Sequence, residues 1–341
     1  MRKRFVLSID GGGIRGLIPS VLLSSLKEKL ENYRLNKPFH EIFDLMAGTS
    51  TGGLIALALS VPLYRKTYGE PYDEKGGVSA DKLPFLYESL GDKAFPGSQY
   101  QVWKILRQLF MSKYSSVPFQ QILNELFKEC TVKMALTNIL ITTFDMKSMT
   151  PVFIKRRPLF AGGGEDPDFY MSDAALSTAA VPTYFPPAYV ESVNGANGDF
   201  CLVDGGVFCI NPALSALIET RKMYPYAEYV ILSLGTGVQI EEYKTETIKK
   251  WGFFNWIAPW LRVPLIAAVG DGQRISTNHM LKKLPQVTLY RIDINLDRGK
   301  GAMDDGSREN LCYLWDKAYE MMDLHKETID RFVKEVTGEY I

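Results

Sequence analysis

The chain has 341 residues, 46% of them hydrophobic, and its 39 lysines and arginines balance its 39 aspartates and glutamates. This length allows one large α/β domain with a substantial core. The formal net charge of zero gives no overall positive field, so we expect no nucleic-acid polymer as a partner. The four cysteines lie in apolar runs without metal-ligand spacing, which indicates buried thiols and no metal site.

The N-terminal part of the chain repeats a unit of strand, turn and helix. Residues 5–9 read as a buried strand, 10–13 as a tight turn and 16–31 as a helix, and a second strand over 43–47 leads into another apolar helix. Further strands are predicted over 138–144, 151–154, 200–203, 228–234 and 287–294, and further helices over 173–180, 212–223 and 305–336. This alternation predicts an α/β fold with a mostly parallel central sheet and helices on both faces.

Two segments interrupt this alternation, and we treat both as insertions in a single domain of residues 1–341. The first, 61–130, includes an amphipathic helix predicted over 101–110. The second, 240–280, contains the apolar stretch 251–269 with three tryptophans, but the polar residues and prolines inside it argue against a membrane-spanning helix. Both insertions are candidate lids or regulatory segments.

The N-terminal sequence MRKRFVLSIDGGG has basic residues followed by an apolar stretch of only five residues. A secretory signal peptide needs a longer apolar region and a small-residue cleavage site, and this segment has neither. We therefore expect a cytoplasmic protein.

The pentapeptide GTSTG at 48–52 fits G-x-S-x-G, the pattern of a serine on a sharp turn between a strand and a helix. Gly48 and Gly52 allow close backbone approach, and the start of a helix favours developing negative charge at Ser50. The same residues also describe an ordinary Gly/Ser/Thr-rich N-cap. The motif alone leaves both interpretations open.

The segment DGGGIRG at 10–16 follows the first strand and opens the first helix, so its N–H groups could bind an anion. One candidate is a pyrophosphate, because Gly11, Gly13 and Gly16 satisfy G-x-G-x-x-G and Glu31 could bind a ribose. The other is the oxyanion of acyl transfer, which needs two or three fixed N–H donors. A nucleotide-binding protein therefore stands beside a hydrolase.

A nucleophilic serine needs a base. His40 and His325 lie in polar or amphipathic helical segments and are interpreted as surface or packing residues. His279 completes the order Ser50, Asp204, His279 of an α/β-hydrolase triad. In FCLVDGG, Asp204 follows a buried strand and precedes two glycines, where it would emerge at the edge formed by the strand-end loops, although a structural Asp-Gly turn has the same pattern.

Taken together, DGGGIRG, GTSTG and DGG resemble the patatin-like phospholipase family, bacterial members included, in which a glycine-rich oxyanion loop, a nucleophile elbow and a dyad aspartate occur in this order. STAAVPTYFPP at 177–187 is similar to the segment before the family's aspartate strand. The likeness covers residues 5–215 and, more weakly, 230–237. It implies the family's three-layer α/β/α fold.

The resemblance implies that Ser50 attacks an ester carbonyl and that Asp204 takes the serine proton directly, without a histidine. An α/β-hydrolase, by contrast, normally has several strands before its elbow. The implied oxyanion hole consists of glycine-loop residues and one elbow residue, namely Gly11, Gly12, Gly13, Arg15 and Thr51. No cofactor and no metal are implied.

The implied substrates are fatty-acyl esters of phospholipids or lysophospholipids, and peripheral contact with the inner face of the membrane follows as an expectation. Aromatic residues of 251–260 could supply that contact or belong to a core or lid. Some bacterial relatives are switched on by cyclic oligonucleotides in anti-phage defence, which makes such an activator a hypothesis here.

Overall fold

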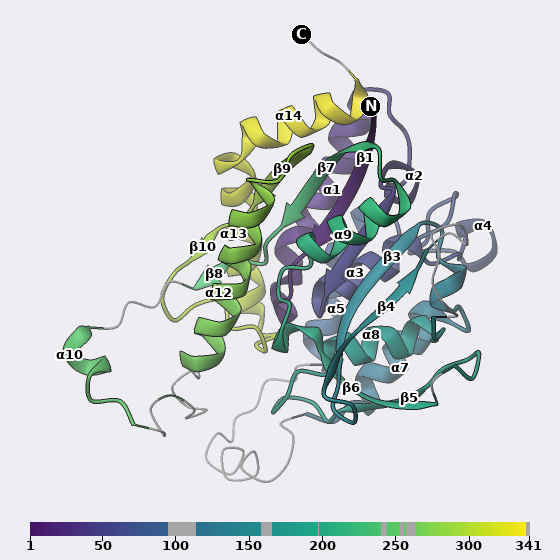
Figure 1. Ribbon diagram of the computed structural model, residues 1–341. Helices are drawn as coiled ribbons and strands as arrows, with labels where there is room; N and C mark the ends of the chain where they lie inside the picture. Colours follow the sequence, from purple (N-terminus) through teal and green to yellow (C-terminus); the bar gives the residue numbers. More distant parts are fainter. Residues whose placement is uncertain are drawn as a thin grey trace.

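The computed structural model describes residues 1–94, 114–157, 166–196, 198–239, 244–252, 256 and 264–338. The amphipathic helix predicted over 101–110 lies outside the described residues. In the described part, the central sheet has eight strands (Figure 1). Their order is β5 (Ala188–Glu191), β6 (Asp199–Asp204), β3 (Asn138–Asp145), β2 (Leu45–Thr49), β1 (Arg2–Ile9), β7 (Ala227–Leu234) and β9 (Val287–Ile292), and β4 (Thr150–Arg156) also pairs with β3.

The middle of the sheet is parallel, as predicted. β1 pairs in parallel with β2 and β7, β2 with β3, and β7 with β9. Antiparallel strands occupy the other end, where β4 and β6 both run against β3 and β5 runs against β6. The sequence did not predict β5, a short strand in which buried and exposed residues alternate.

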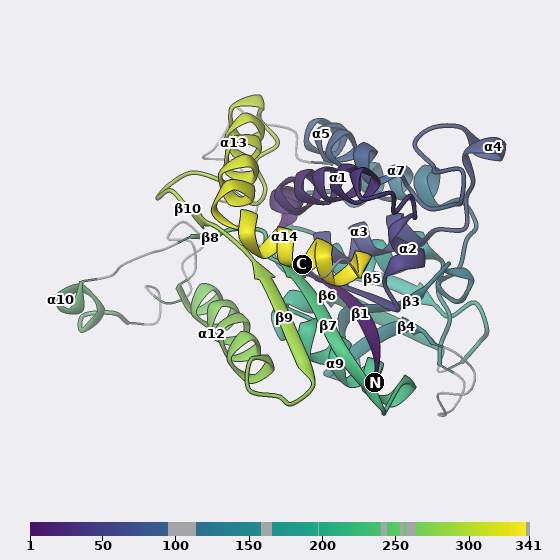
Figure 2. The same cartoon turned by 90° about the horizontal axis from the view of Figure 1, so that it is seen from above.

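Helices cover both faces of the sheet. Side chains of β1 point alternately to the two faces, so each face carries apolar residues that need to be buried. Leu7 and Ile9 belong to one core cluster, and Val6 belongs to the other. The first cluster is formed with α1 (Leu17–Asn32), α3 (Thr51–Ser60), α5 (Leu83–Ala94), α7 (Val117–Phe127), α8 (Met171–Ala179), α13 (Arg308–Leu324) and α14 (Lys326–Thr337). The second includes residues of α9 (Ala213–Met223) and α12 (Pro264–Leu281), which lie across the sheet from α1, α13 and α14 in Figure 2. The three-layer fold is confirmed.

The C-terminal segment predicted as one helix over 305–336 is two helices. The break is at His325, whose ring Nε2 lies 2.8 Å from the Asp293 carbonyl oxygen. After the break, Phe332 of α14 packs against Phe43 and Tyr290, with ring centroids 6.1 and 5.5 Å apart. Because of the break, α14 packs over the sheet, whereas a straight continuation of α13 would extend away from the sheet.

Several shorter elements join these layers. They are α2 (Phe39–Ile42), α4 (Arg65–Tyr68), α10 (Thr245–Ile248), the paired strands β8 (Val238–Gln239) and β10 (Asn295–Leu296), and the 3-10 turns Gly13–Gly16, Ala80–Lys82, Val132–Met134 and Gly205–Val207. Within the described ranges, no helix has the length and apolar character needed to cross a membrane. Cys130, Cys201 and Cys209 are buried as expected, but Cys312 is exposed on the outer side of α13.

The register of the strands aligns their carboxyl ends. Ile9 at the end of β1 pairs with Gly48 on one side and with Leu234 on the other, and Thr49 pairs with Thr142 of β3. The loops that follow β1, β2 and β7 therefore start at the same level of the sheet. This edge holds the glycine loop and the serine turn.

Candidate active site

Ser50 occupies a sharp turn between β2 and α3. Its φ of 54° and ψ of −124° lie outside the regions that L residues normally adopt, and the residue is 5% exposed. A Cβ on Gly48 would lie 2.1 Å from the backbone of Gly52, and a Cβ on Gly52 would lie 2.1 Å from the Ile9 oxygen. The two glycines are therefore a steric requirement of the turn, as the motif predicts.

Threonines hold this turn in place. The Ser50 N–H donates to Thr178 Oγ1 over 2.8 Å, and that hydroxyl donates to the Thr142 carbonyl over 2.8 Å. On the other side, the Thr49 hydroxyl donates to the Cys209 carbonyl over 2.7 Å. No role for Thr178 was predicted from the sequence, where its position in the small-residue segment 177–187 was the one available signal.

Asp204 reaches the serine turn from an antiparallel strand. It pairs with Thr143, the residue after the Thr142 that stands beside Thr49. β6 thus begins beyond the ends of the parallel strands and runs back toward them. The predicted position at the common edge holds, but the strand arrives from the opposite direction. A Cβ on Gly205 would lie 2.2 Å from Thr142 Oγ1, so a glycine is needed directly after the aspartate.

The Asp204 carboxylate is 3% exposed and accepts a hydrogen bond from the Gly206 N–H over 2.7 Å. Burial raises the pKa of Asp204 from its usual 3.8 to about 7, and hydrogen bonding from the Ser50 side chain and the Gly206 N–H opposes the rise. The carboxylate therefore lies near the serine side chain and gains a proton near neutral pH.

The glycine loop lies against the serine. A Cβ built on Gly11 would be 3.4 Å from the Ser50 Cβ. The Gly11 N–H donates to the Ile210 carbonyl over 3.1 Å, so it is already engaged in this structure. The N–H groups of Gly12 and Gly13 have no hydrogen-bond partner among the described residues. Of the three predicted glycine donors, these two are not already engaged with another described residue.

Arg15 and Thr51 support the loop and the turn in different ways. The buried Arg15 side chain donates through Nε to the Gly301 carbonyl. The Arg15 side chain therefore links the glycine loop to the loop that contains Gly301. The Thr51 hydroxyl contacts the Tyr87 hydroxyl, and its N–H lies in the first turn of α3, where helical N–H groups have no intrahelical partner.

Comparison with known proteins places this geometry in a family. The family model "Patatin-like phospholipase" matches residues 7–217. The chain is 31% identical to "Patatin-like protein 2" of Oryza sativa subsp. indica, over 98% of this chain and 87% of that protein. It is 36% identical to "Patatin-07" of Solanum tuberosum, over 74% of this chain and 66% of that protein. The chain belongs to the patatin-like phospholipase family.

This patatin-like protein is a lipid acyl hydrolase, as its family and relatives indicate. Among solved structures, "Human GIVD cytosolic phospholipase A2" aligns with 97% of this chain and 60% of that one, at 10% identity and a TM-score of 0.38.

A pocket opens next to Ser50 of the patatin-like chain. It has an empty volume of about 570 Å³, part of which is open to solvent, and it also borders Gly13 and Thr51. Its walls are mainly apolar and aromatic, with Leu54, Phe119 and Phe185 among them. Phe119 comes from the 61–130 segment, so this predicted insertion forms part of the pocket.

The histidine of the alternative triad lies elsewhere. His279 is exposed in the last turn of α12, whereas Ser50 and Asp204 are buried. Among the described residues, the groups that act on the Asp204 carboxylate by hydrogen bonding are the Ser50 side chain and the Gly206 N–H, and no imidazole is one of them. In the described part of the chain, therefore, no histidine links Asp204 to Ser50.

The nucleotide-binding alternative also needs an acidic residue near the glycine loop to bind the ribose. Glu31 lies in the last turn of α1, about 21 Å from the start of the helix at 1.5 Å of rise per residue. Its carboxylate pairs with Lys27 over 3.0 Å. The residue expected to bind a ribose is therefore at the far end of the helix that the loop opens.

Proposed function

We propose that this patatin-like hydrolase cleaves fatty-acyl esters of phospholipids or lysophospholipids through a Ser50–Asp204 dyad. The observation that carries the proposal is the placement of buried Asp204 near Ser50, which occupies a strained strand-to-helix turn and whose side chain lowers the pKa of this acid by hydrogen bonding. A base must lie within hydrogen-bond reach of the proton that it removes. Asp204 meets this condition.

In the first half of the reaction, ionised Asp204 accepts the Ser50 proton while the serine oxygen bonds to the ester carbonyl carbon. The electron pair of the carbonyl moves to its oxygen. That oxyanion accepts hydrogen bonds from the N–H groups of Gly12 and Gly13 and from the Thr51 N–H at the start of α3. Gly11, whose N–H is engaged with Ile210, contributes by holding the loop.

In the second half, the carbonyl re-forms, the bond to the leaving alkoxide breaks, and the proton on Asp204 passes to that alkoxide. The acyl group is then an ester of Ser50. A water attacks it, with Asp204 taking the water proton, and collapse of the new oxyanion releases the fatty acid. The same proton then returns to the Ser50 oxygen, which restores the dyad.

The apolar pocket holds the acyl chain. Leu54, Phe119 and Phe185 supply surface without a charge, which suits a hydrocarbon better than a polar group. Since Tyr87 and Phe119 both border the pocket, the 61–130 segment forms part of its wall. This position supports a role of the segment as a lid.

Peripheral membrane contact is supported by exposed apolar side chains on and near α12. Leu265, Val269 and Ile275 are 45%, 52% and 60% exposed, and Trp256 is 37% exposed. Phe253, Phe254 and Trp260, which the sequence also marked for this role, lie outside the described residues. Location at the inner membrane face and activation by a cyclic oligonucleotide stay predictions of the family resemblance, the latter tested by adding such nucleotides to the assay below.

The test compares the parent protein with Ser50→Ala, Asp204→Asn and His279→Ala. Each is incubated with mixed phospholipid vesicles and with a soluble short-chain ester, and fatty-acid release is followed by mass spectrometry. We expect release by the parent and by His279→Ala, and loss of release in the other two. Parent-level release by Ser50→Ala would rule out this nucleophile, and loss of release in His279→Ala would restore the triad.

A further inference from the structure

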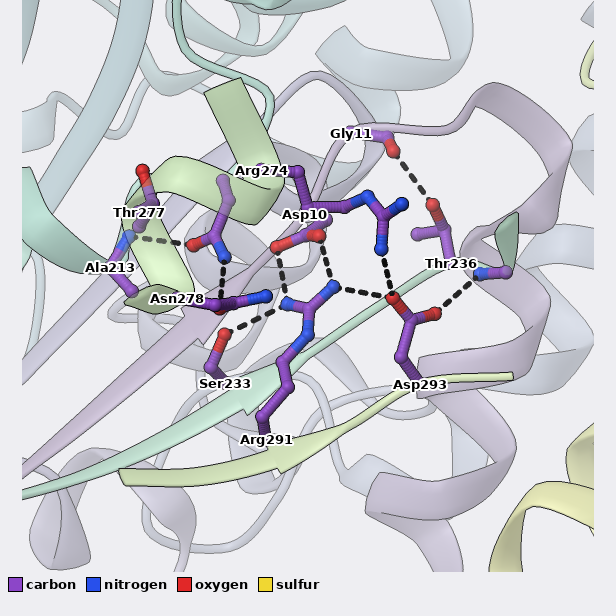
Figure 3. A network of polar contacts seen from close by, with 12 residues as sticks. Asp10, Gly11, Ala213, Ser233, Thr236, Arg274, Thr277, Asn278, Arg291 and Asp293 are labelled. Carbon is purple, nitrogen blue, oxygen red and sulfur yellow. Dashed lines mark hydrogen bonds and ion pairs between the residues drawn. The ribbon is translucent and has the colours of Figure 1, made fainter. Parts of the chain in front are cut away.

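A buried ion-pair network lies behind the glycine loop (Figure 3). Asp10, the residue directly before the three glycines, is 1% exposed. Arg291 of β9 binds it with two parallel bonds, Nη1 to Oδ1 over 2.9 Å and Nη2 to Oδ2 over 2.6 Å. This fork-like pairing fixes the carboxylate in direction as well as position. Arg291 lies outside residues 7–217, where the family model matches.

A second acid and a second base balance this pair. Asp293 accepts from Arg291 Nη2 over 2.6 Å and from Arg274 Nη1 over 3.2 Å through the same oxygen. Its other oxygen accepts from the N–H groups of Gly237 and Ile294 over 3.2 and 3.0 Å. Asp10 and Asp293 thus pair with two guanidinium groups, and Arg274 also pairs with the more exposed Asp271 over 3.0 Å. Pairing of this kind offsets much of the cost of burying the charges.

Helix α12 holds the loop from a second direction. The Gln273 side chain accepts from the Asn211 N–H over 2.9 Å and donates to the Asn211 carbonyl over 3.1 Å. The preceding residue, Ile210, accepts the Gly11 N–H. Arg274, the neighbour of Gln273, belongs to the ion-pair network. Two adjacent residues of α12 therefore support the glycine loop, Gln273 through the segment of Ile210 and Asn211, and Arg274 through the ion-pair network.

The glycines themselves offer no side chains by which the protein could hold them. Their backbone is freer than that of any other residue, so the direction of their N–H groups depends on what fixes the flanking residues. Oxyanion stabilisation requires donors placed before the reaction, within a few tenths of an ångström of their ideal positions. The Asp10 side chain and the Gly11 N–H are the points at which the network fixes the loop.

We propose that Arg291, supported by Arg274 and Gln273 of α12, is a positioning residue that keeps the Gly12 and Gly13 N–H groups aimed at the reacting carbonyl. Arg291 touches neither substrate nor Ser50 and acts through Asp10. The inference rests on the proposed function, because it assigns the glycine loop to the oxyanion. It also makes α12 part of the catalytic support.

A matched control lies near the start of β1, the strand that leads into Asp10. Arg4 binds Asp44 over 2.7 Å, with side chains 17% and 20% exposed, and its Nε, like that of Arg291, is buried without a hydrogen-bond partner in the described ranges. Arg4→Lys and Arg291→Lys therefore each remove a guanidinium group that is paired with a carboxylate, and each keeps the positive charge. They differ in whether the pair adjoins the glycine loop.

The experiment measures kcat and KM on a soluble ester together with the melting temperature. We expect Arg291→Lys to lower kcat at least about tenfold and to change KM less than about twofold, because misplaced donors weaken the transition state more than the ground state. Arg4→Lys keeps kcat within about twofold of the parent, whatever its melting temperature. Parent-level kcat in folded Arg291→Lys would overturn the inference.

Two further variants separate positioning from stability. Arg291→Met alone leaves an uncompensated buried carboxylate, whereas Asp10→Asn with Arg291→Met removes both charges and leaves Asp293 with Arg274. We expect the double variant to regain melting temperature over Arg291→Met while kcat stays low. Recovery of kcat together with melting temperature would reduce Arg291 to a structural residue and overturn the inference.

Gln273→Leu tests the second support without changing a charge. We expect a severalfold fall in kcat at little change in KM, and this variant decides the case if the Arg291 variants do not fold. A parent-level kcat in Gln273→Leu then overturns the inference. Failure of the proposed function looks different, because in that case the parent protein itself hydrolyses neither vesicle lipid nor ester.

Discussion

Two buried aspartates border the glycine loop and the serine turn, and their surroundings differ. Asp204 has a hydroxyl and a backbone N–H as its described partners, whereas Asp10 has a forked guanidinium. Burial raises the pKa of both carboxyl groups, but at Asp10 the Arg291 charge opposes this effect, and at Asp204 only hydrogen bonds do. Asp204 can therefore exchange a proton, as a catalytic base must. Asp10 is instead held in place by Arg291, as a support for the glycine loop should be.

The largest expected effect comes from exchanging each acid for its amide. Asp204→Asn removes the base and should lower kcat by about 10³-fold or more, near the upper part of what general-base catalysis contributes. Asp10→Asn keeps the base and should lower kcat by about 10–100-fold through the loop. Initial rates on a soluble ester measure both. Equal losses in the two variants would erase the distinction between base and support.

A smaller loss is expected from Gly12→Ala. The added Cβ would lie 2.3 Å from Thr236 Oγ1, whose hydroxyl donates to the Gly11 carbonyl over 2.7 Å. Displacing that hydroxyl loosens the loop, and kcat should fall about tenfold or more. Gly272→Ala is the control, since its Cβ meets nothing within 4 Å. An unchanged kcat in folded Gly12→Ala would argue against a role of this loop.

The pH dependence of kcat should follow Asp204. The base works only when ionised, so kcat should rise with pH and level off above about 7, with a roughly tenfold fall for each pH unit below that value. An ester without ionisable groups, measured from pH 5 to 9, gives the profile. Asp10→Asn should keep the inflection at a lower rate. If the inflection disappears in that variant, the titrating group is Asp10.

The stability of the folded state should fall as pH rises, whereas kcat should increase. The folded pKa of Asp204 is raised above its usual 3.8, so the stability linked to its proton is complete below about pH 4 and is lost as pH rises through about 7. Asp204→Asn cannot ionise and should be more stable than the parent above pH 8 by about 2–4 kcal/mol, since one pKa unit corresponds to about 1.4 kcal/mol. Thermal melting at pH 5 and pH 8.5 measures this difference.

Asp145→Asn provides a control of opposite sign. Burial opposes the shift, but hydrogen bonds from Ser148 and from the N–H groups of Cys201 and Lys147 hold the pKa of Asp145 below its usual value. Its ionised form therefore adds stability that is present at neutral pH and lost as pH falls. This variant should melt below the parent at pH 7. A gain in both variants would mean that the amide itself stabilises.

The parts of the site that the sequence predicted depend on local sterics. Gly48 and Gly52 flank a turn that admits no larger residue, and the strand before it and helix after it follow from a short apolar run. The glycine loop was predictable for the same reason. Local sequence could not, however, tell that the Gly11 N–H is taken by Ile210, because that contact depends on where a distant loop lies.

Other features depend on pairings between distant residues. Asp10 and Arg291 are 281 positions apart, and no spacing or motif links them. The direction of β6 is set by its pairing with β3, which a strand's own sequence does not specify. Similarly, the break at His325 lies inside a continuous amphipathic pattern, and the ring's contact with Asp293 at that point joins residues that are far apart in the sequence.

The stretch from Asp204 to Ile210 constrains how such a protein can be altered. Asp204 contacts the serine, the Cys209 carbonyl accepts from Thr49 beside the turn, and the Ile210 carbonyl accepts from Gly11. Inserting or deleting a single residue here would shift all three contacts at once. A designer who moves this site to another scaffold must therefore transfer the stretch whole and at fixed length, whereas the pocket walls can be varied one residue at a time.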